Sequence, residues 1–438
     1  GGATMPLPIE IMEQALGQYL GLFRDCFSQP QWQHFVTVLL ALMQCEEHRT
    51  LSALLRKIAG VGHRVDGLSR FLKEAPWKAE LVVARWWRHY CQTLGPMVVA
   101  EHARQRALRP KRPGRPRKTV VTGFLIVDDS THEKRKGEKM EGLGRHYSST
   151  AKKTVKGHSL FASLYILLGR RCPLAPSLYR QKAVCEREEV PFKSKVDLAE
   201  EVIRTFEPVP GTRTHALMDS WYTCRKLWRL VLGRGWAITG GLKSNRKLRV
   251  EVPEEGRVYR SLSQFAASLA DDFKAVDWPH EDGSSRQVYA HLVRTFVKNL
   301  GPCQVLIVKE RLDQPLKEVR YWATSELQAD LATVVGWVAQ RWAIEQFIAD
   351  VKEVFGSDQY QIRSAKAILR FWHLGFLGYL YLEEQRAILQ ADGTEPLLTI
   401  GQTRWRQQKR HKRLLLDWIR DRYAEGLTAE QVDQLLAA

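Results

Sequence analysis

The stretch "GFLIVDDSTHEKRKG", Gly123–Gly137, decides how the chain folds. Its apolar run, Phe124–Val127, is typical of a buried β-strand, and it ends on two adjacent aspartates, Asp128 and Asp129. Two carboxylates at the tip of a buried strand are costly unless something positive faces them. The stretch therefore predicts a strand with a functional site at its end.

The segments that follow this strand alternate between strands and helices. We expect strands at residues 120–127, 158–168, 214–222 and 236–239, and helices at residues 194–206 and 223–232. Strands followed by helices indicate an α/β sheet. Residues 241–330 have a different pattern, a series of short alternating runs that predicts a β-rich segment.

The last third of the chain is predicted to be helical. One helix of about 25 residues is expected from near Ala329 to Phe355, and an apolar helix from Ala365 to Leu389. A basic segment, "TRWRQQKRHKR", follows at residues 403–413. We expect Arg404 and Arg406 in this segment to contact DNA; a dimer contact is the alternative.

The first hundred residues show helical periodicity throughout, so we expect residues 8–105 to be all-helical. Within them, a helix, a short turn at Gly60–Gly62 and a second helix follow helix-turn-helix logic. The second helix would present Arg64, Arg70 and Lys73 to DNA. An ordinary helical hairpin with a solvated basic face is the alternative interpretation.

A basic, proline-rich stretch, "RPKRPGRPRKT", occupies residues 109–119. Three prolines and a glycine exclude a helix. The Gly114-Arg115-Pro116 core resembles an AT-hook, in which arginines enter the narrow minor groove of A·T-rich DNA. We expect a linker that contacts DNA through Arg112, Arg115, Arg117 and Lys118; a linker that is merely basic is the alternative.

Composition favours a nucleic acid as the partner. The chain has 67 Lys and Arg against 48 Asp and Glu, a formal net charge of +19. Such a charge attracts polyanions, with an affinity that falls steeply as salt is added. Seven scattered cysteines without a CxxC pair indicate a reducing compartment. The apolar stretches are too short to span a bilayer, so we expect no membrane partner and a cytoplasmic, nucleoid-associated location.

Three acidic residues stand apart from the others. Asp129 and Asp219 each follow an apolar run, and Glu345 lies on the long late helix. Taken singly, the aspartates could cap turns and the glutamate could lie on a solvated face. Together, two strand ends and a facing helix could converge three carboxylates on Mg²⁺, which prefers hard oxygen ligands.

The late helix supports a metal site that acts on DNA. Arg341, Glu345 and Lys352 are four and seven residues apart, so they form one stripe beside an apolar stripe. We expect Glu345 to bind the metal while Arg341 and Lys352 hold the flanking phosphates.

Four motifs carry a resemblance to a known family: "IVDDST", "GHSLFASLYIL", "LMDSWY" and "RWAIEQFIADVK". In this order they resemble the DDE transposases of bacterial insertion sequences. The chain is most similar to the branch in which a β-rich domain interrupts the ribonuclease H-like catalytic core between the second and third acids. The branch's signature of Tyr, Arg, Glu and Lys matches at Arg341, Glu345 and Lys352, but its tyrosine position is Val338 here.

The resemblance implies a domain organisation. It comprises a helical DNA-binding domain (5–108), the basic linker (109–119), the first part of the core (120–240), the β-rich insertion (241–328), the core helix with the third acid (329–360) and a helical basic region (361–438). The fold class is thus α/β: a ribonuclease H-like core with a β-rich insertion, preceded by an all-helical domain.

The resemblance also implies the chemistry. Asp129, Asp219 and Glu345 would hold two Mg²⁺ ions, with Mn²⁺ able to replace them, for two-metal phosphoryl transfer. The enzyme would cut the terminal inverted repeats of an element and join them to target DNA as a homodimer. Where hairpin ends form, Trp278 or Trp322 would stack a flipped base; packing of both tryptophans in the β-rich core is the alternative.

The two adjacent aspartates cannot both reach one metal, because neighbouring strand residues point to opposite faces. The family's first acid directly precedes a Ser/Thr pair, which selects Asp129, followed by Ser130 and Thr131. Asp128 would then point away and support stability or binding. Two other functions compete with transposition: a ribonuclease H-like DNA endonuclease that cuts without joining, and a non-catalytic DNA-binding regulator.

Overall fold

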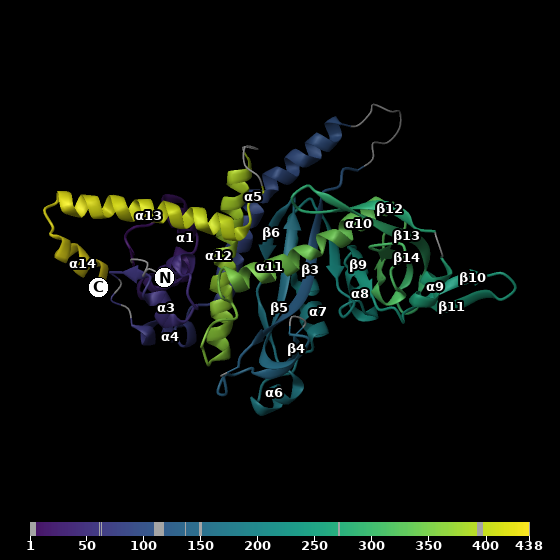
Figure 1. The fold of residues 1–438 in the computed structure, drawn as a ribbon, viewed down its shortest axis with the longest axis horizontal. Coiled ribbons are helices and arrows are strands. Elements are labelled where there is room, and N and C mark those ends of the chain that lie inside the picture. Colours follow the sequence, from purple (N-terminus) through teal and green to yellow (C-terminus); the bar gives the residue numbers. More distant parts are fainter. Residues whose placement is uncertain are drawn as a thin grey trace.

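The protein was analysed as a computed structural model that describes residues 6–60, 62, 64–108, 118–135, 137–148, 151–269, 272–391 and 397–437. A large mixed sheet extends from a helical body into a β-rich region (Figure 1). Within the described ranges this sheet has 13 strands, β1 and β2 form a separate pair, and helices make up the remaining regular structure. The chain is therefore a mixed α/β protein, as the alternation of strands and helices predicts.

Four strands form the centre of the sheet. β3 (Thr122–Glu133) pairs antiparallel with β5 (Lys153–Leu167) and parallel with β8 (Arg213–Met218), and β8 pairs parallel with β9 (Ala237–Leu242). The free edge of β5 is covered in turn by three short strands: β4 (Gly144–Ser148), β7 (Ser177–Tyr179) and β6 (Arg170–Pro173). This arrangement confirms the four strands expected from the sequence and fixes the edge at which β3 and β8 present their acids.

The first strand is longer than the prediction of residues 120–127. β3 continues to Glu133 because its backbone stays paired with β5, with Asp129 opposite Phe161 and Thr131 opposite Ser159. Asp129 therefore lies within a strand and does not close it. β8 is shorter than the predicted strand at residues 214–222, because it ends at Met218, and Asp219 follows it directly.

Two helices connect the central strands. α7 (Lys195–Thr205) precedes β8, and α8 (Arg225–Gly233) connects β8 to β9. Ser194 begins α7 with a capping box, because its hydroxyl accepts from the amide of Asp197 while the Asp197 side chain accepts from the amide of Ser194. The capping residue and the apolar periodicity indicate the same helix, which explains why the predicted range, residues 194–206, is close to that of α7.

The β-rich segment extends the same sheet. It contains β10 (Lys247–Val252), β11 (Gly256–Ser261), α9 (Leu262–Ser268), β12 (Lys274–Pro279), β13 (Ser285–Val297), β14 (Gly301–Lys309) and β15 (Arg320–Thr324). β15 pairs antiparallel with β9, so the hydrogen-bond ladder runs from the central strands into this segment without a break. The segment predicted as an insertion thus shares one sheet with the core.

The expected 25-residue helix is two helices, which corrects the prediction. α10 (Leu331–Gln340) and α11 (Trp342–Glu353) meet at Arg341. There the amides of Arg341 and Ile344 bond to the carbonyls three residues earlier, at 3.2 Å and 3.4 Å, so the last turn of α10 is tightened. α10 packs on β12, β13 and β14, whereas α11 packs on β3 and β5.

The amino-terminal part is not entirely helical, which also corrects the prediction. Its helices are α1 (Gln14–Gly21), η1 (Arg24–Cys26), α2 (Gln29–Gln44), α3 (Leu51–Leu55), α4 (Val65–Lys73) and α5 (Ala79–Ala107). A two-residue parallel pair joins β1 (Leu7–Pro8) to β2 (Ile58–Ala59). Its bonds hold the start of the chain against the end of the α3 segment.

The two ends of the chain form one helical body, on the left of Figure 1. α12 (Ala365–Ala391) packs against α2, α4 and α5, α13 (Ile400–Ala424) packs against α2, and α14 (Ala429–Ala437) packs against β2. Arg370 on α12 donates to the carbonyls of Leu72 (3.0 Å) and Trp77, so it closes the carboxyl end of α4. In the described part of the chain, no helix is long and apolar enough to cross a membrane.

Candidate active site

The adjacent aspartates on β3 face opposite sides of the sheet, as strand geometry predicts. The carboxylate of Asp129 is bonded to Lys195 on α7, whereas the carboxylate of Asp128 is bonded to Arg341, where α10 meets α11. Glu345 lies on the Asp128 side, because Arg341 also pairs with Glu345. Asp129 and Glu345 therefore lie on opposite faces of the sheet, whereas we expected them on the same face.

Asp129 is held by two side chains. Lys195 Nζ lies 2.5 Å from Asp129 Oδ2, and the hydroxyl of Tyr222 donates to Asp129 Oδ1 at 2.7 Å. Burial, and next the charge of Asp129, raise the pKa of Tyr222, so this hydroxyl remains a proton donor. Both oxygens of Asp129 thus have partners on the α7 side of the sheet.

Asp128 lies in a less favourable environment. Arg341 Nη1 is 3.4 Å from Asp128 Oδ2, and the amide of Asp129 donates to Asp128 Oδ1 at 2.8 Å. Burial raises the pKa of Asp128 to about 7; Arg341 opposes this rise, and the carboxylate of Asp219 adds to it. A second positive charge near Asp128 would therefore be favourable.

Asp219 lies in the turn after β8. Its Oδ1 accepts from the amides of Trp221 at 2.9 Å and Tyr222 at 3.1 Å, and the hydroxyl of Thr223 donates to its carbonyl at 2.7 Å. The turn cap proposed as the alternative role of this residue is thus present. The same turn places Asp219 in the lining of a cleft, together with Glu345.

This cleft has a volume of about 530 Å³ and contains most of the predicted catalytic group. Its walls bring together Asp219, Arg341 and Glu345 with the two predicted tryptophans, Trp278 and Trp322. The ring centroids of these tryptophans are 6.3 Å apart, and both rings contact the small apolar cluster beneath α10. The packing role is thus present, and because both tryptophans also line the cleft, base stacking stays a prediction.

The sequence reasoning missed Trp342. This first residue of α11 also lines the cleft, and 56% of it is exposed. Trp342 and the predicted catalytic Glu345 thus line the same cleft from one helix. Its position directly after Arg341 in the "RWAIEQ" motif was the available signal.

The residues present suit a divalent cation by their chemistry. Carboxylate oxygens are hard ligands of the kind that Mg²⁺ takes, and Asp128 and Glu345 already share one cation, the guanidinium of Arg341. In the part of the chain that the structure describes, no group of three His, Cys, Asp or Glu side chains is arranged to hold a metal ion.

Lys352 does not extend toward solvent. Its Nζ donates to the carbonyl of Thr131 on β3 at 3.3 Å, and burial lowers its pKa. The stripe of Arg341, Glu345 and Lys352 is therefore present, but both cations are bonded within the protein. Their expected contact with phosphates remains a prediction.

The predicted DNA-binding residues fall into three groups. Arg64, Arg70 and Lys73 are exposed around α4, whose Leu68, Phe71 and Leu72 are buried, and Lys118 is exposed as well. Arg112, Arg115 and Arg117 lie outside the described residues. Arg404 and Arg406 belong to α13, and Arg406 is half-buried.

Arg404 is buried in the helical body, whereas the prediction expected it at a surface that contacts DNA. It is 8% exposed, and its guanidinium donates to the carbonyls of Met43 (2.9 Å) and Cys45 at the end of α2. Burial lowers its pKa to about 10. Arg404 is thus a cap for α2, because an arginine can satisfy several terminal carbonyls of a helix at once.

Comparison with known families agrees with this geometry. The chain matches the DDE superfamily endonuclease family over residues 22–262, more than half of its length, and the transposase DDE domain over residues 193–381. The first match includes Asp128, Asp129 and Asp219, and the second includes Asp219 and Glu345. No curated protein matches the chain significantly. The chain belongs to the DDE superfamily endonucleases, and its residues 193–381 are similar to the transposase DDE domain.

Proposed function

We propose that the protein is a DNA transposase that cuts the ends of an insertion sequence and joins them to target DNA. The observation that carries this proposal is the convergence of Asp219 and Glu345 in one cleft, with Asp128 linked to Glu345 through Arg341. The central strand order is β5, β3, β8, β9, with only β5 antiparallel, and it is compatible with the expected ribonuclease H-like core. It supports the assignment made from the four motifs.

The strand acid that binds metal is proposed to be Asp128. The motif selected Asp129, but Asp128 shares a face with Glu345, whereas both oxygens of Asp129 are engaged by Lys195 and Tyr222. Two Mg²⁺ ions, or Mn²⁺, held by Asp128, Asp219 and Glu345 would supply an activated water and stabilise the leaving oxygen. Asp129 would keep β3 in place against α7.

The protein's own groups would orient the DNA. Arg341 lies between two carboxylates and would turn to a phosphate oxygen when cations neutralise those acids. Trp278 and Trp322, with Trp342 beside them, form an aromatic wall that can stack an unpaired base. This wall supports a route through hairpin ends, and cutting two ends together supports a homodimer in the DNA complex.

Joining of pre-cleaved ends separates a transposase from a simple endonuclease. We expect the protein, given Mg²⁺, a target plasmid and duplexes with the element's inverted repeats and free 3′-hydroxyl ends, to form covalently joined products. Gel analysis of labelled ends measures these products, and duplexes with blocked 3′ ends are the control. Cleavage of uncut ends without any joining would instead identify the endonuclease.

The outer face of α13 is proposed to bind the DNA backbone in place of Arg404. Lys409, Lys412 and Arg413 are exposed there, and the ammonium of Lys409 lies 3.7 Å from the ring centroid of the exposed Trp405. Lys412 and Arg413 have no ion pair with any described residue. α4 lies at the opposite edge of the helical body (Figure 1), so the two surfaces would contact different stretches of DNA.

Replacing Lys409, Lys412 and Arg413 together with alanine should weaken DNA binding at low salt. Each phosphate that the protein no longer neutralises reduces the slope of log K against log salt by about 1, so the slope should become shallower by about 2–3. Fluorescence anisotropy at several salt concentrations measures the slope. Arg420→Ala is the matched control, because Asp417 (3.0 Å) and Asp421 already engage that arginine. An unchanged slope in the triple variant would remove α13 from the DNA interface.

A further inference from the structure

The hairpin of β12 and β13 carries a glutamate at its tip that reaches the core. The turn between these strands is well defined, since the amide of His280 donates to the carbonyl of Ser284 at 2.8 Å and Gly283 adopts a φ of +81°. The hairpin packs on α10. Glu281, in this turn, extends from the β-rich region to β6, which pairs with β5 of the central sheet, and to α12.

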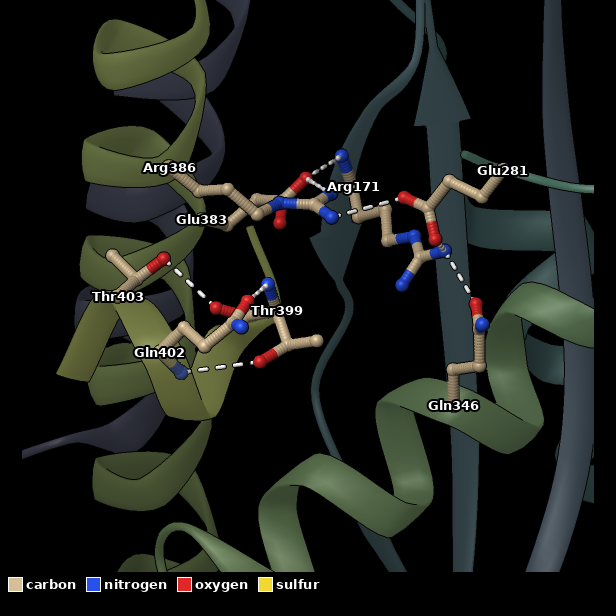
Figure 2. A network of polar contacts seen from close by, with 8 residues as sticks. All are labelled: Arg171, Glu281, Gln346, Glu383, Arg386, Thr399, Gln402 and Thr403. Carbon is tan, nitrogen blue, oxygen red and sulfur yellow. Dashed lines mark hydrogen bonds and ion pairs between the residues drawn. The ribbon is translucent and has the colours of Figure 1, made fainter. Parts of the chain in front are cut away.

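Glu281 binds two buried arginines (Figure 2). Its Oε2 lies 2.6 Å from Arg171 on β6, and its Oε1 lies 3.0 Å from Arg386 on α12. The side chains of these arginines are 5% and 7% exposed, and Arg386 also pairs with the buried Glu383 at 2.9 Å. Two cations therefore face two anions, and one of the anions comes from the hairpin.

No other carboxylate takes the place of Glu281 among the described residues. The nearby Asp350 is half-buried, and burial raises its pKa to about 7, so it supplies only part of a charge near neutral pH. Without Glu281 the buried group would carry an excess positive charge, which is costly in a desolvated position. Moving the hairpin away from β6 would leave the same uncompensated positive charge. The ion pairs of Glu281 therefore hold the hairpin against β6 and α12.

The same contacts reach two elements that line the cleft. Trp278, three residues before Glu281 on β12, is one of the lining residues. Arg171 Nη2 donates to Gln346 Oε1 at 2.7 Å (Figure 2), and Gln346 is the neighbour of Glu345, which also lines the cleft. Glu281 and Arg171 thus connect the strand that carries Trp278 to the helix that carries Glu345.

We propose that Glu281 is a positioning residue that latches the β12–β13 hairpin to Arg171 and Arg386 and so fixes the distance between Trp278 and Glu345 across the cleft. The effect on cleavage rests on the proposed function, whereas the latch itself does not. Glu281 touches no reacting atom; it acts through Trp278, Arg171 and Gln346.

Hydrogen–deuterium exchange of the full chain tests the latch directly. In Glu281→Gln, which keeps the shape of the side chain and removes its charge, backbone amides in residues 274–284 and 342–353 should exchange roughly tenfold faster. Glu281→Ala should show the same change or a larger one. Asp277→Asn is the matched control, since Asp277 is exposed on the same strand and loses the same charge. A thermal melt of each variant confirms that it is folded.

The results separate the latch from the proposed function. Faster exchange in both segments, with a lower cleavage rate and an unchanged affinity for DNA, supports the positioning role. Exchange equal to that of Asp277→Asn overturns the latch, and faster exchange with a wild-type cleavage rate overturns its role in positioning. If the unmodified protein neither cuts nor joins DNA, the proposed function fails, and the exchange rates still decide whether the latch exists.

Discussion

We expect DNA cleavage to fall below detection when Asp128 is replaced by asparagine, whereas Asp129→Asn should retain activity reduced by about 10–100-fold. The difference arises because Asp128 shares its face of the sheet with Arg341 and Glu345, while Asp129 is bonded to Lys195 and Tyr222 on the other face. Loss of a metal ligand removes the ion's chemistry, whereas loss of a supporting group only shifts the strand. Single-turnover cleavage of labelled element ends in Mg²⁺ measures both rates.

Glu345→Gln and Asp219→Asn provide the reference for full loss of activity in this experiment. Binding of element-end DNA by all four variants, measured without divalent ions, is the control for folding. If Asp129→Asn were inactive and Asp128→Asn still cleaved DNA, the metal-binding acid would be Asp129, as the Ser130-Thr131 context predicts.

Arg404→Ala should lower the free energy of unfolding by about 2–4 kcal/mol, because it leaves buried carbonyls unsatisfied and removes a packed side chain. The carbonyls of Met43 and Cys45 would both lose the Arg404 donor, and of the two only Met43 would keep another, Gln408 at 3.1 Å. The helical body should therefore loosen where α13 packs on α2. Urea denaturation followed by circular dichroism measures the loss.

Arg413→Ala is the matched control for this stability measurement. Arg413 lies on the exposed face of the same helix, and exposed substitutions usually change stability by less than about 0.5 kcal/mol. We expect Arg413→Ala to unfold like the unmodified protein. A normal stability for Arg404→Ala together with weaker DNA binding would return Arg404 to the DNA interface.

Much of the sheet was predictable because local signals agree with the tertiary structure. The apolar runs that became β5, β8 and β9 are bounded by turn residues, and Ser194 marks the start of α7 with a capping box. Asp219 was located well because it directly follows β8. In these places, the residues alone contain enough information to specify the structure.

The remaining features depend on contacts between distant segments. The sequence has no glycine or proline at the junction between α10 and α11, Arg341. The break arises from packing, since α10 packs on β12–β14 while α11 packs on β3 and β5. The choice between Asp128 and Asp129 depends on which face α11 covers, and sequence context does not give that face. Arg404 illustrates the same limit, since a basic run looks identical whether its arginines are solvated or cap a helix.

The continuous ladder from β9 to β15 has a consequence for any shortened version of this enzyme. β9 is hydrogen-bonded on both sides, to β8 and to β15. Excising residues 243–324 would leave all of β9, six buried residues, with one side of its backbone unpaired. Bare edges of this kind recruit strands from other molecules. A minimal nuclease made by this deletion would therefore aggregate unless a new strand or charged residues protected the edge.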